Sequence, residues 1–123
     1  MANPNIVNVT SIYGNTSYLI PTGTTATTWT ALTPAVGTVN KIDNIVAANV
    51  TGTSANITVS VNSATGGGGT AYRLAYQIVV PPNATLIICD KSTSFYLGEA
   101  QSIVVTSGTT NAIELIASYE AIT

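Results

Sequence analysis

The sequence predicts an all-β fold, a single antiparallel β-sandwich of jelly-roll type, and three observations lead to this prediction. Apolar and polar residues alternate with a period of two along most of the chain, which is typical of half-buried strands. Turn formers such as Gly, Asn and Pro recur at short intervals, as expected for a two-sheet sandwich. No stretch shows the 3.6-residue apolar period of an amphipathic helix.

The N-terminal part of the chain predicts the weaker strands. Three candidates are Asn5–Tyr13, Ser17–Ile20 and Thr25–Leu32, whose inward faces mix Thr and Asn with apolar residues. The segment Gly14–Thr16 between the first two predicts a short loop, because Gly and Asn are turn formers. Residues 1–16 as a whole are therefore expected to form an N-terminal arm or an edge strand.

The middle of the chain predicts stronger strands. Residues Lys41–Val50 alternate, and so do residues 56–61, where Ile57, Val59 and Val61 share one face. The intervening Thr51–Ser54 predicts a hairpin between them. In the first of these strands the face predicted to be inward carries Ile42, Asn44, Val46, Ala48 and Val50.

The next strand is bounded by a glycine-rich loop and a pair of prolines. Residues 71–80 alternate, with Tyr72, Leu74, Tyr76, Ile78 and Val80 on the face predicted to be buried. Pro81 and Pro82 end the strand, because proline cannot donate a hydrogen bond to a ladder. Residues 62–70 contain Gly66–Gly69, and four consecutive glycines predict a flexible loop.

The C-terminal part predicts the remaining strands, which bring the total to about eight to ten. They are Thr85–Cys89, Phe95–Leu97, Ser102–Thr106 and Ala112–Glu120. In the last strand Ile113, Leu115, Ala117 and Tyr119 share the inward face, so Ile116 faces outward. The length of 123 residues fits one domain over residues 1–123.

Composition excludes several classes of protein. Charged residues make up only 7% of the chain, and the net charge is -2. Nucleic-acid binding is not expected, because it requires clusters of Lys and Arg. A membrane partner is not expected either, because the longest apolar runs are far shorter than a membrane helix. The single Cys89 cannot form an internal disulfide and no signal peptide is visible, so synthesis in a reducing cytoplasm without signal-peptide export is expected.

The residues needed for common catalytic and metal sites are missing or scattered. The chain has no histidine, which removes the usual general base and metal ligand. Cys89 lies among apolar residues and reads as a small buried hydrophobe. Nothing in the pattern selects a catalytic pair from the carboxylates. We therefore predict no enzyme activity, no cofactor, and no catalytic, cofactor-binding or metal-ligating residue. The carboxylates in question are Asp43, Asp90, Glu99, Glu114 and Glu120.

The outward faces of the predicted strands carry apolar residues where a free sandwich would carry charges. Such faces are typical of surfaces that a neighbour covers. We therefore expect a structural or interaction module, either a homo-oligomer or a part of a larger shell. The apolar residues predicted to face outward are Ile45, Ala47, Ala75, Val79, Ile87, Val104 and Ile116.

Several motifs in order resemble a family of small virion structural proteins of tailed bacteriophages, frequent in cyanophages. The resemblance covers residues 17 to the C-terminus. It rests on the Ile20-Pro21-Thr22-Gly23-Thr24-Thr25 turn, the Lys41–Asn49 strand, Val79–Leu86, Phe95–Ile103 and the closing strand Ile116–Glu120. Residues Thr27–Val39 and Gly66–Gly69 depart from the family by lengthening connections that are usually short.

The resemblance implies a virion location and a β-sandwich without catalytic residues. Its leading implication is a capsid decoration or cement protein that stabilises the head by contacts with the major capsid protein or other virion proteins. A neck, tail or fibre component is the alternative within the family. A host-surface carbohydrate-binding module is the other alternative, and exposed aromatic side chains would be its stacking platforms. The aromatic residues available are Tyr13, Tyr18, Trp29, Tyr72, Tyr76 and Tyr96, although Trp29 reads more readily as a packing anchor.

Overall fold

A computed structural model describes residues 3–123 and contains nine strands and three short 3₁₀ helices in that range. The strands are β1 (Ile12–Leu19), β2 (Thr27–Thr28), β3 (Val39–Asn49), β4 (Ala55–Asn62), β5 (Ala71–Val80), β6 (Thr85–Cys89), β7 (Phe95–Leu97), β8 (Ser102–Ser107) and β9 (Ile113–Ile122). The 3₁₀ helices are η1 (Thr30–Leu32), η2 (Thr65–Gly67) and η3 (Lys91–Thr93).

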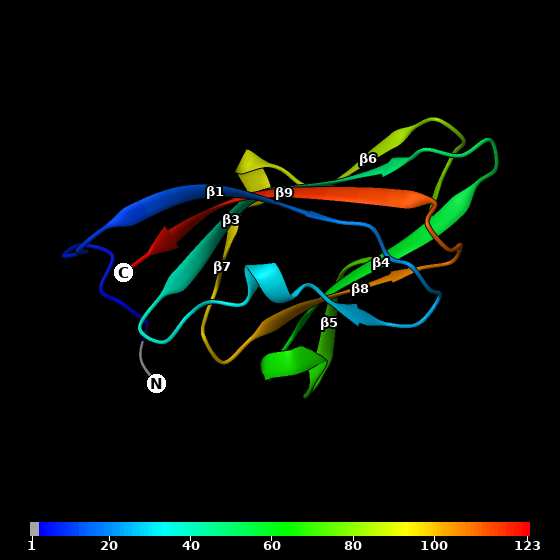
Figure 1. The fold of residues 1–123 in the computed structure, drawn as a ribbon. Coiled ribbons are helices and arrows are strands. Elements are labelled where there is room, and N and C mark those ends of the chain that lie inside the picture. Colours follow the sequence, from blue (N-terminus) through cyan, green and yellow to red (C-terminus); the bar gives the residue numbers. More distant parts are fainter. Residues whose placement is uncertain (1–2) are drawn as a thin grey trace.

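The strands form two antiparallel sheets that pack face to face (Figure 1). The first sheet has the order β1-β9-β3-β6, with β7 also paired to β3, and the second has the order β2-β8-β4-β5. We call them sheet A and sheet B. Four strand pairs are nested in sequence, so that each pair encloses the next: β1–β9, β2–β8, β3–β6 and β4–β5. This nesting is the jelly-roll arrangement, so the predicted fold class is confirmed.

The hydrophobic core lies between the two sheets. Sheet A contributes Ile42, Ile45 and Leu115, and sheet B contributes Ile57 and Ile103, all of them fully buried. The 3₁₀ helix η1 and the residue before it close one side of the core. The residues that do so are Trp29 and Leu32, which are also fully buried.

The link between β3 and β4 corrects the predicted hairpin. The two strands belong to different sheets and do not pair, so Thr51–Ser54 is part of a crossing from one sheet to the other. Asn49 holds this corner, because its buried side-chain amide donates to the carbonyl oxygens of Thr53 (2.8 Å) and Val80 (3.0 Å). The amide oxygen of Asn49 accepts the N–H of Thr51 at 3.0 Å. The polar sequence of the link Thr51–Ser54 is therefore compatible both with a hairpin within one sheet and with a crossing between the two sheets.

A β-bulge reverses the predicted inward face of β3. The register between β3 and β9 shifts between Ile42 and Asn44, which leaves Asp43 as an extra residue. An extra residue exchanges the two faces of a strand beyond it. As a result Ile45 and Ala47 lie in the core, and Val46 faces outward rather than inward.

Two further bulges disrupt the alternation of β5. Its register with β4 shifts between Ile57 and Val59 and again between Val59 and Ser60. Gln77, in the first irregular region, has a positive φ of 49°. The prediction that Tyr72, Leu74, Tyr76 and Ile78 are buried is wrong: their side chains are 65%, 38%, 57% and 41% exposed. Two one-residue bulges together restore the original alternation, so Tyr72 still lies opposite Val61 on the core-facing side, but the edge strand β5 leaves its side chain largely uncovered.

The beginning of the chain also differs from the prediction. The expected loop at Gly14–Thr16 is the middle of β1, which pairs with β9 without a register shift from Ile12 to Leu19. Residues 3–11 contain no strand. The expected strand Thr25–Leu32 is reduced to the two residues of β2 followed by η1. Long-range pairing with β9 has overridden the local turn signal of Gly and Asn.

The glycine-rich loop between β4 and β5 lies against the outer face of sheet B. The N–H of Gly67 donates to Ser102 Oγ at 2.9 Å, and Ser102 Oγ in turn donates to the carbonyl of Ala64 at 2.7 Å. The side-chain amide of Asn62 donates to the carbonyl of Gly67 at 2.8 Å. Val104, predicted to be an outward apolar residue, is buried beside this loop. The flexibility of the loop stays a prediction.

Adding a methyl group at Gly67 should destabilise the protein more than adding one at Gly66. Both glycines have positive φ, 79° and 65°, which costs an L-residue about 1 kcal/mol. A Cβ at Gly67 would also lie 2.7 Å from Thr28 Oγ1, whereas a Cβ at Gly66 meets nothing within 4 Å. We expect Gly67→Ala to lower the free energy of unfolding by about 2–3 kcal/mol, and Gly66→Ala by about 1 kcal/mol. Urea denaturation measures both, and equal losses would contradict the packing of the loop.

Candidate functional site

An apolar row crosses the outer face of sheet A from one edge to the other. Tyr18 on β1 lies directly opposite Ile116 on β9, Ile116 lies opposite Val46 on β3, and Val46 lies opposite Ile87 on β6. Tyr18, Ile87 and Ile116 are 74%, 62% and 44% exposed, and Val46 is partly exposed. We call these four residues the apolar band. The strands β1, β9, β3 and β6 each supply one side chain to it.

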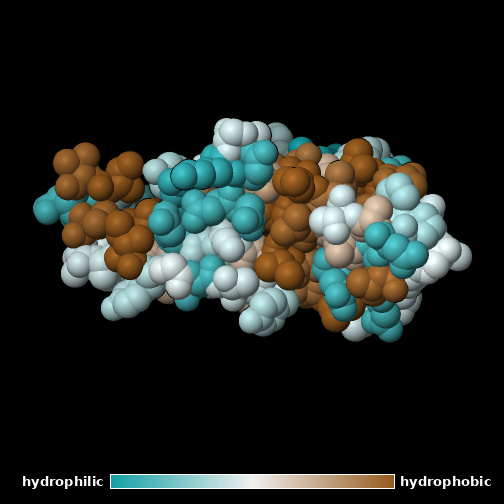
Figure 2. Space-filling model, turned by 90° about the horizontal axis from the view of Figure 1, so that it is seen from above, coloured by the Kyte–Doolittle hydropathy of each residue, from teal (hydrophilic) through white to brown (hydrophobic). Residues whose placement is uncertain are grey.

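The surroundings of the apolar band are mostly uncharged. On one side it is bordered by Thr16, Ser118 and Asn44, which occupy the next outward positions of β1, β9 and β3. On the other side the exposed Glu114 occupies the outward position of β9 next to Ile116, opposite Ala48 of β3. The other charged residues lie further along the strands, where Lys41 Nζ is 3.9 Å from Asp43 Oδ1 and Lys41 lies opposite Glu120 in the ladder. Figure 2 shows this face, with hydrophobic residues gathered in a band across the strands beside a hydrophilic region.

The sequence predicted part of this surface correctly. Ile87 and Ile116 are exposed as expected, and so is Val79 on β5. Val46 and Tyr18 were not predicted to face outward together with them, because the bulge in β3 and the continuity of β1 are invisible in the local pattern. Three residues predicted to face outward instead face the core: Ile45, Ala47 and Ala75. Val104 does lie on the outer face of sheet B, but the glycine-rich loop covers it, so it is buried.

The aromatic residues do not gather in one concave site. Trp29 is buried, and its Nε1 donates to Ser17 Oγ at 3.0 Å, so its interpretation as a packing anchor is confirmed. The exposed tyrosines are spread over three strands and both sheets: Tyr13 and Tyr18 on β1, Tyr72 and Tyr76 on β5, and Tyr96 on β7. Tyr119 is half-buried rather than fully buried, and its hydroxyl donates to the carbonyl of Ala31 at 3.3 Å.

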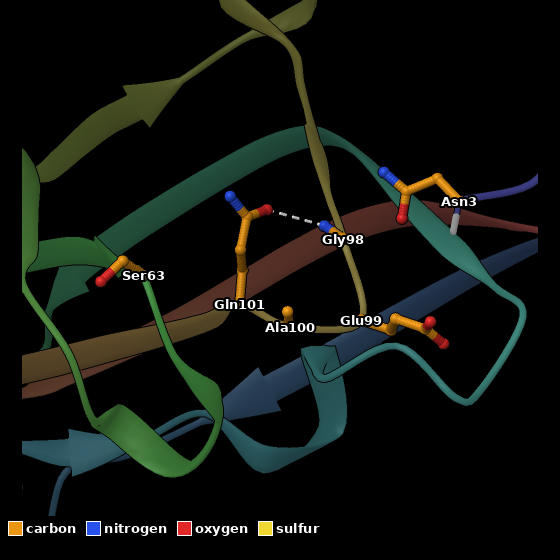
Figure 3. A pocket seen from close by; sticks show the side chains of 6 residues that line it. All are labelled: Asn3, Ser63, Gly98, Glu99, Ala100 and Gln101. Atoms are coloured by element: carbon orange, nitrogen blue, oxygen red, sulfur yellow. Dashed lines mark hydrogen bonds between the residues drawn. The ribbon is translucent and has the colours of Figure 1, made fainter. Parts of the chain in front are cut away.

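A polar hollow of about 290 Å³ lies beside the turn between β7 and β8 (Figure 3). It is lined by Asn3, Ser63 and the turn residues 98–101. Glu99 in this turn is almost fully buried; its Oε2 accepts the N–H of Gly37 at 2.7 Å, while its Oε1 has no hydrogen-bond partner within residues 3–123. In Figure 3 the carboxylate points away from Gln101, whose Oε1 accepts the N–H of Gly98 at 2.8 Å. The turn position of Glu99 gave no sign of this burial.

Asp90 caps the 3₁₀ helix η3. Asp90 Oδ1 accepts the N–H of Ser92 at 2.9 Å at the start of η3, and hydrogen bonds from Ser92 lower the pKa of this carboxyl.

Among residues 3–123, no group of three or more His, Cys, Asp or Glu side chains could hold a metal ion. The same part of the chain holds no helix that is long and apolar enough to span a membrane.

The Cys89 thiol should be unreactive while the protein is folded. Its residue is only 3% exposed, and burial raises the pKa of the thiol above its ordinary value. Because the thiolate is the nucleophile, a thiol reagent such as dithiobis(nitrobenzoate) at pH 8 should react only after denaturation. Reaction of the native protein at the rate of a free cysteine would contradict the placement of Cys89 in the core.

Comparison with known proteins yields similarity at the level of solved structures only. No protein-family model matches the chain, and no curated protein matches its sequence significantly. One similar structure is a chain of Bacillus endospore appendages, described as disulfide-linked pili, with 17% identity over 91% of this chain and 86% of that one, at a TM-score of 0.46. Another is a chain of the virus-like particle of the extra small virus of the giant freshwater prawn Macrobrachium rosenbergii. It has 15% identity over 98% of this chain and 86% of that one, at a TM-score of 0.41. Neither TM-score reaches 0.5, so neither likeness assigns this chain to a family.

Proposed function

We propose that this chain is a structural protein of a tailed-phage virion, and that it decorates the head by docking the outer face of sheet A on the capsid shell. The observation that carries the proposal is the apolar band, a row of outward Tyr, Ile and Val side chains across β1, β9, β3 and β6. Exposed apolar rows of this kind are typical of interaction surfaces. The sequence motifs that resemble phage virion proteins supply the virion context.

The geometry of the apolar band suits a flat protein partner. Its side chains project from a hydrogen-bonded sheet, so the backbone is already ordered before the band is covered. Its uncharged neighbours Thr16 and Ser118 lower the cost of removing water from the contact. A jelly roll is used by viral capsid proteins and by lectins alike, so the fold by itself does not choose between these functions.

Cosedimentation with purified heads tests the proposal. The chain, produced separately, is mixed with heads of the phage that encodes it, and bound protein is counted per particle after sedimentation. We expect many copies per head, as a repeated shell surface would provide. Binding to isolated tails or necks with none to heads would instead support the alternative placement on those parts of the virion. Binding to neither would overturn the virion proposal.

A carbohydrate-binding module remains a second candidate because two exposed tyrosines, Tyr72 and Tyr76, lie on the same strand, β5. The guanidinium of Arg73, the residue after Tyr72, lies 5.1 Å from the centroid of the Tyr76 ring. Exposed rings of this kind can stack on sugars. A glycan array tests this candidate: specific binding that is lost in Tyr76→Ala would favour it, and the absence of any binding would remove it.

A further inference from the structure

The free edge of β1 differs from every other edge of the two sheets. Its eight residues, Ile12–Leu19, pair with β9 on one side without a register shift, and within residues 3–123 no strand pairs with them on the other side. The strand contains no charged residue and no proline. Natural sheets usually protect an edge with charges, proline or bulges, and β1 has none of these.

The other sheet edges are interrupted. The opposite edge of sheet A is divided between β6 and the three-residue β7, with η3 between them. In sheet B one edge is β2, which has only two residues, and the other is β5, which carries two register shifts and the charged Arg73. A regular strand could therefore be added to β1 more readily than to any of these edges.

The backbone groups that point out of this edge follow from the pairing with β9. Ser11 and Thr123 exchange both of their backbone hydrogen bonds, at 3.2 and 2.9 Å. Hydrogen-bonded and non-hydrogen-bonded pairs alternate in an antiparallel ladder, and the register is continuous from there. The N–H and C=O groups that point away from β9 are therefore those of Ile12, Gly14, Thr16 and Tyr18.

We propose that the free edge of β1 pairs with β1 of a second copy of this chain, antiparallel and about a two-fold axis at Asn15. This register joins Ile12 to Tyr18 of the partner subunit, and Gly14 to Thr16 of the partner subunit. Each outward N–H then meets a carbonyl oxygen of the other strand. A two-fold axis one residue further along, at Thr16, would leave the groups of Ile12 outside this set of pairs.

We assign a second copy of this chain to the free edge of β1, because both strands of a new antiparallel pair must be free of bulges and breaks. When two copies meet through their edges, only β1 offers a long and unbroken strand on each side, and the use of the same edge twice gives a two-fold dimer. No like charges meet, because β1 is uncharged. The exposed side chains of Ile12 and Tyr18, 54% and 74% exposed, become cross-strand neighbours twice by symmetry.

The dimer goes beyond the proposed function, because it would form whatever larger assembly the chain joins. It would extend sheet A across two subunits, so that two apolar bands lie on one continuous surface. A contact limited to one strand from each subunit is small compared with a stable interface. We therefore expect weak association of the free protein, with a dissociation constant in the range of about 10 μM to 1 mM.

Cysteine cross-linking tests the register. Asn15 and its symmetry mate form a non-hydrogen-bonded pair in the proposed dimer, with Cα atoms about 4.5 Å apart, which suits a disulfide. Under mild oxidation we expect Asn15→Cys to form covalent dimers at least ten times faster than Gly52→Cys, which places a thiol in an exposed turn. Thr16→Cys should cross-link as slowly as Gly52→Cys. Faster linking of Thr16→Cys than of Asn15→Cys would overturn the register.

Removal of one edge N–H tests the pairing itself. In Thr16→Pro the lost N–H is one that points away from β9, so the monomer keeps its ladder, whereas strand addition is blocked. Thr16→Ala keeps the N–H and is the matched control. In analytical ultracentrifugation we expect Thr16→Ala to dimerise like the unchanged chain, and Thr16→Pro to stay monomeric, with unchanged circular dichroism.

Two results would overturn the dimer. One is an unchanged chain that stays monomeric at about 1 mM and gives no excess cross-linking through Asn15→Cys. The other is a dimer that Thr16→Pro does not weaken. Binding of Thr16→Pro to phage heads is scored separately, so that failure of the dimer and failure of the virion proposal are distinguishable.

Discussion

Replacement of Ile87 by Glu should lower the affinity of the chain for phage heads by at least about tenfold. Ile87 is 62% exposed and lies at the β6 end of the apolar band. If the shell covers this band, the substitution removes apolar contact and forces a carboxylate out of water, which is costly without a partner. The fold should be unaffected, because the side chain projects from the sheet. Quantitative cosedimentation over a range of protein concentrations measures the change.

Val79→Glu is the matched control for this substitution. Val79 has the same 62% exposure and also lies on an edge strand, but it belongs to β5 of sheet B. The two variants therefore add the same charge to surfaces of similar exposure on different sheets. We expect Val79→Glu to bind heads like the unchanged chain. A larger loss for Val79→Glu than for Ile87→Glu would mean that sheet B, rather than the apolar band, meets the shell.

Replacement of Trp29 by Ala should cause a large loss of stability. The Trp29 side chain fills the side of the sandwich next to η1 and is 1% exposed. Its removal leaves a large cavity and frees Ser17 Oγ from the indole N–H, 3.0 Å away. We expect the free energy of unfolding to fall by about 3–5 kcal/mol, measured by urea denaturation. Since a small domain is stable by only about 5–15 kcal/mol, the variant should be near the limit of folding.

Trp29→Phe separates packing from hydrogen bonding at the same position. Phe keeps part of the apolar volume but has no group to donate to Ser17 Oγ, which lies in a residue only 8% exposed. We expect a smaller loss of about 1–3 kcal/mol. A loss below about 1 kcal/mol for Trp29→Ala would contradict the role of Trp29 as a core anchor.

The strands that follow simple alternation could be predicted from the sequence. The alternation in β9 placed Leu115 and Ala117 inside and Ile116 outside, as the structure has them. The turn at Pro81 and Pro82 ended β5 at the correct residue, because proline cannot continue a ladder. For such strands the period of two is sufficient to assign both the element and its faces.

Other faces could not be predicted because bulges leave no clear local signal. The extra residue at Asp43 in β3 reversed the strand, so Val46 joined the apolar band and Ile45 the core. In β5 the register shift between Ile57 and Val59 interrupts the alternation at the exposed Tyr76, and Tyr72 is exposed although it lies opposite Val61 on the core-facing side of this edge strand. The apolar band depends on the registers of four strands that are distant in sequence, so only half of its residues, Ile87 and Ile116, were identified from local alternation.

The β1 strand and Glu99 show the same limit in different forms. Gly14 and Asn15 carry a turn signal, yet pairing with β9 extends them into a strand. Glu99 lies in a turn, where acids are usually solvated, but Gly37 reaches it from 62 residues away in sequence and donates a hydrogen bond. Both features come from contacts between segments whose proximity exists only in the folded chain.

An electron cryomicroscopy map of the virion tests the central claim most directly, because it gives position, copy number and orientation together. We predict many copies of the jelly roll on the head, each with Tyr18, Val46, Ile87 and Ile116 of sheet A against the shell. A map in which the chain is present with this face open to solvent, or in which the chain is absent from the particle, would contradict the account.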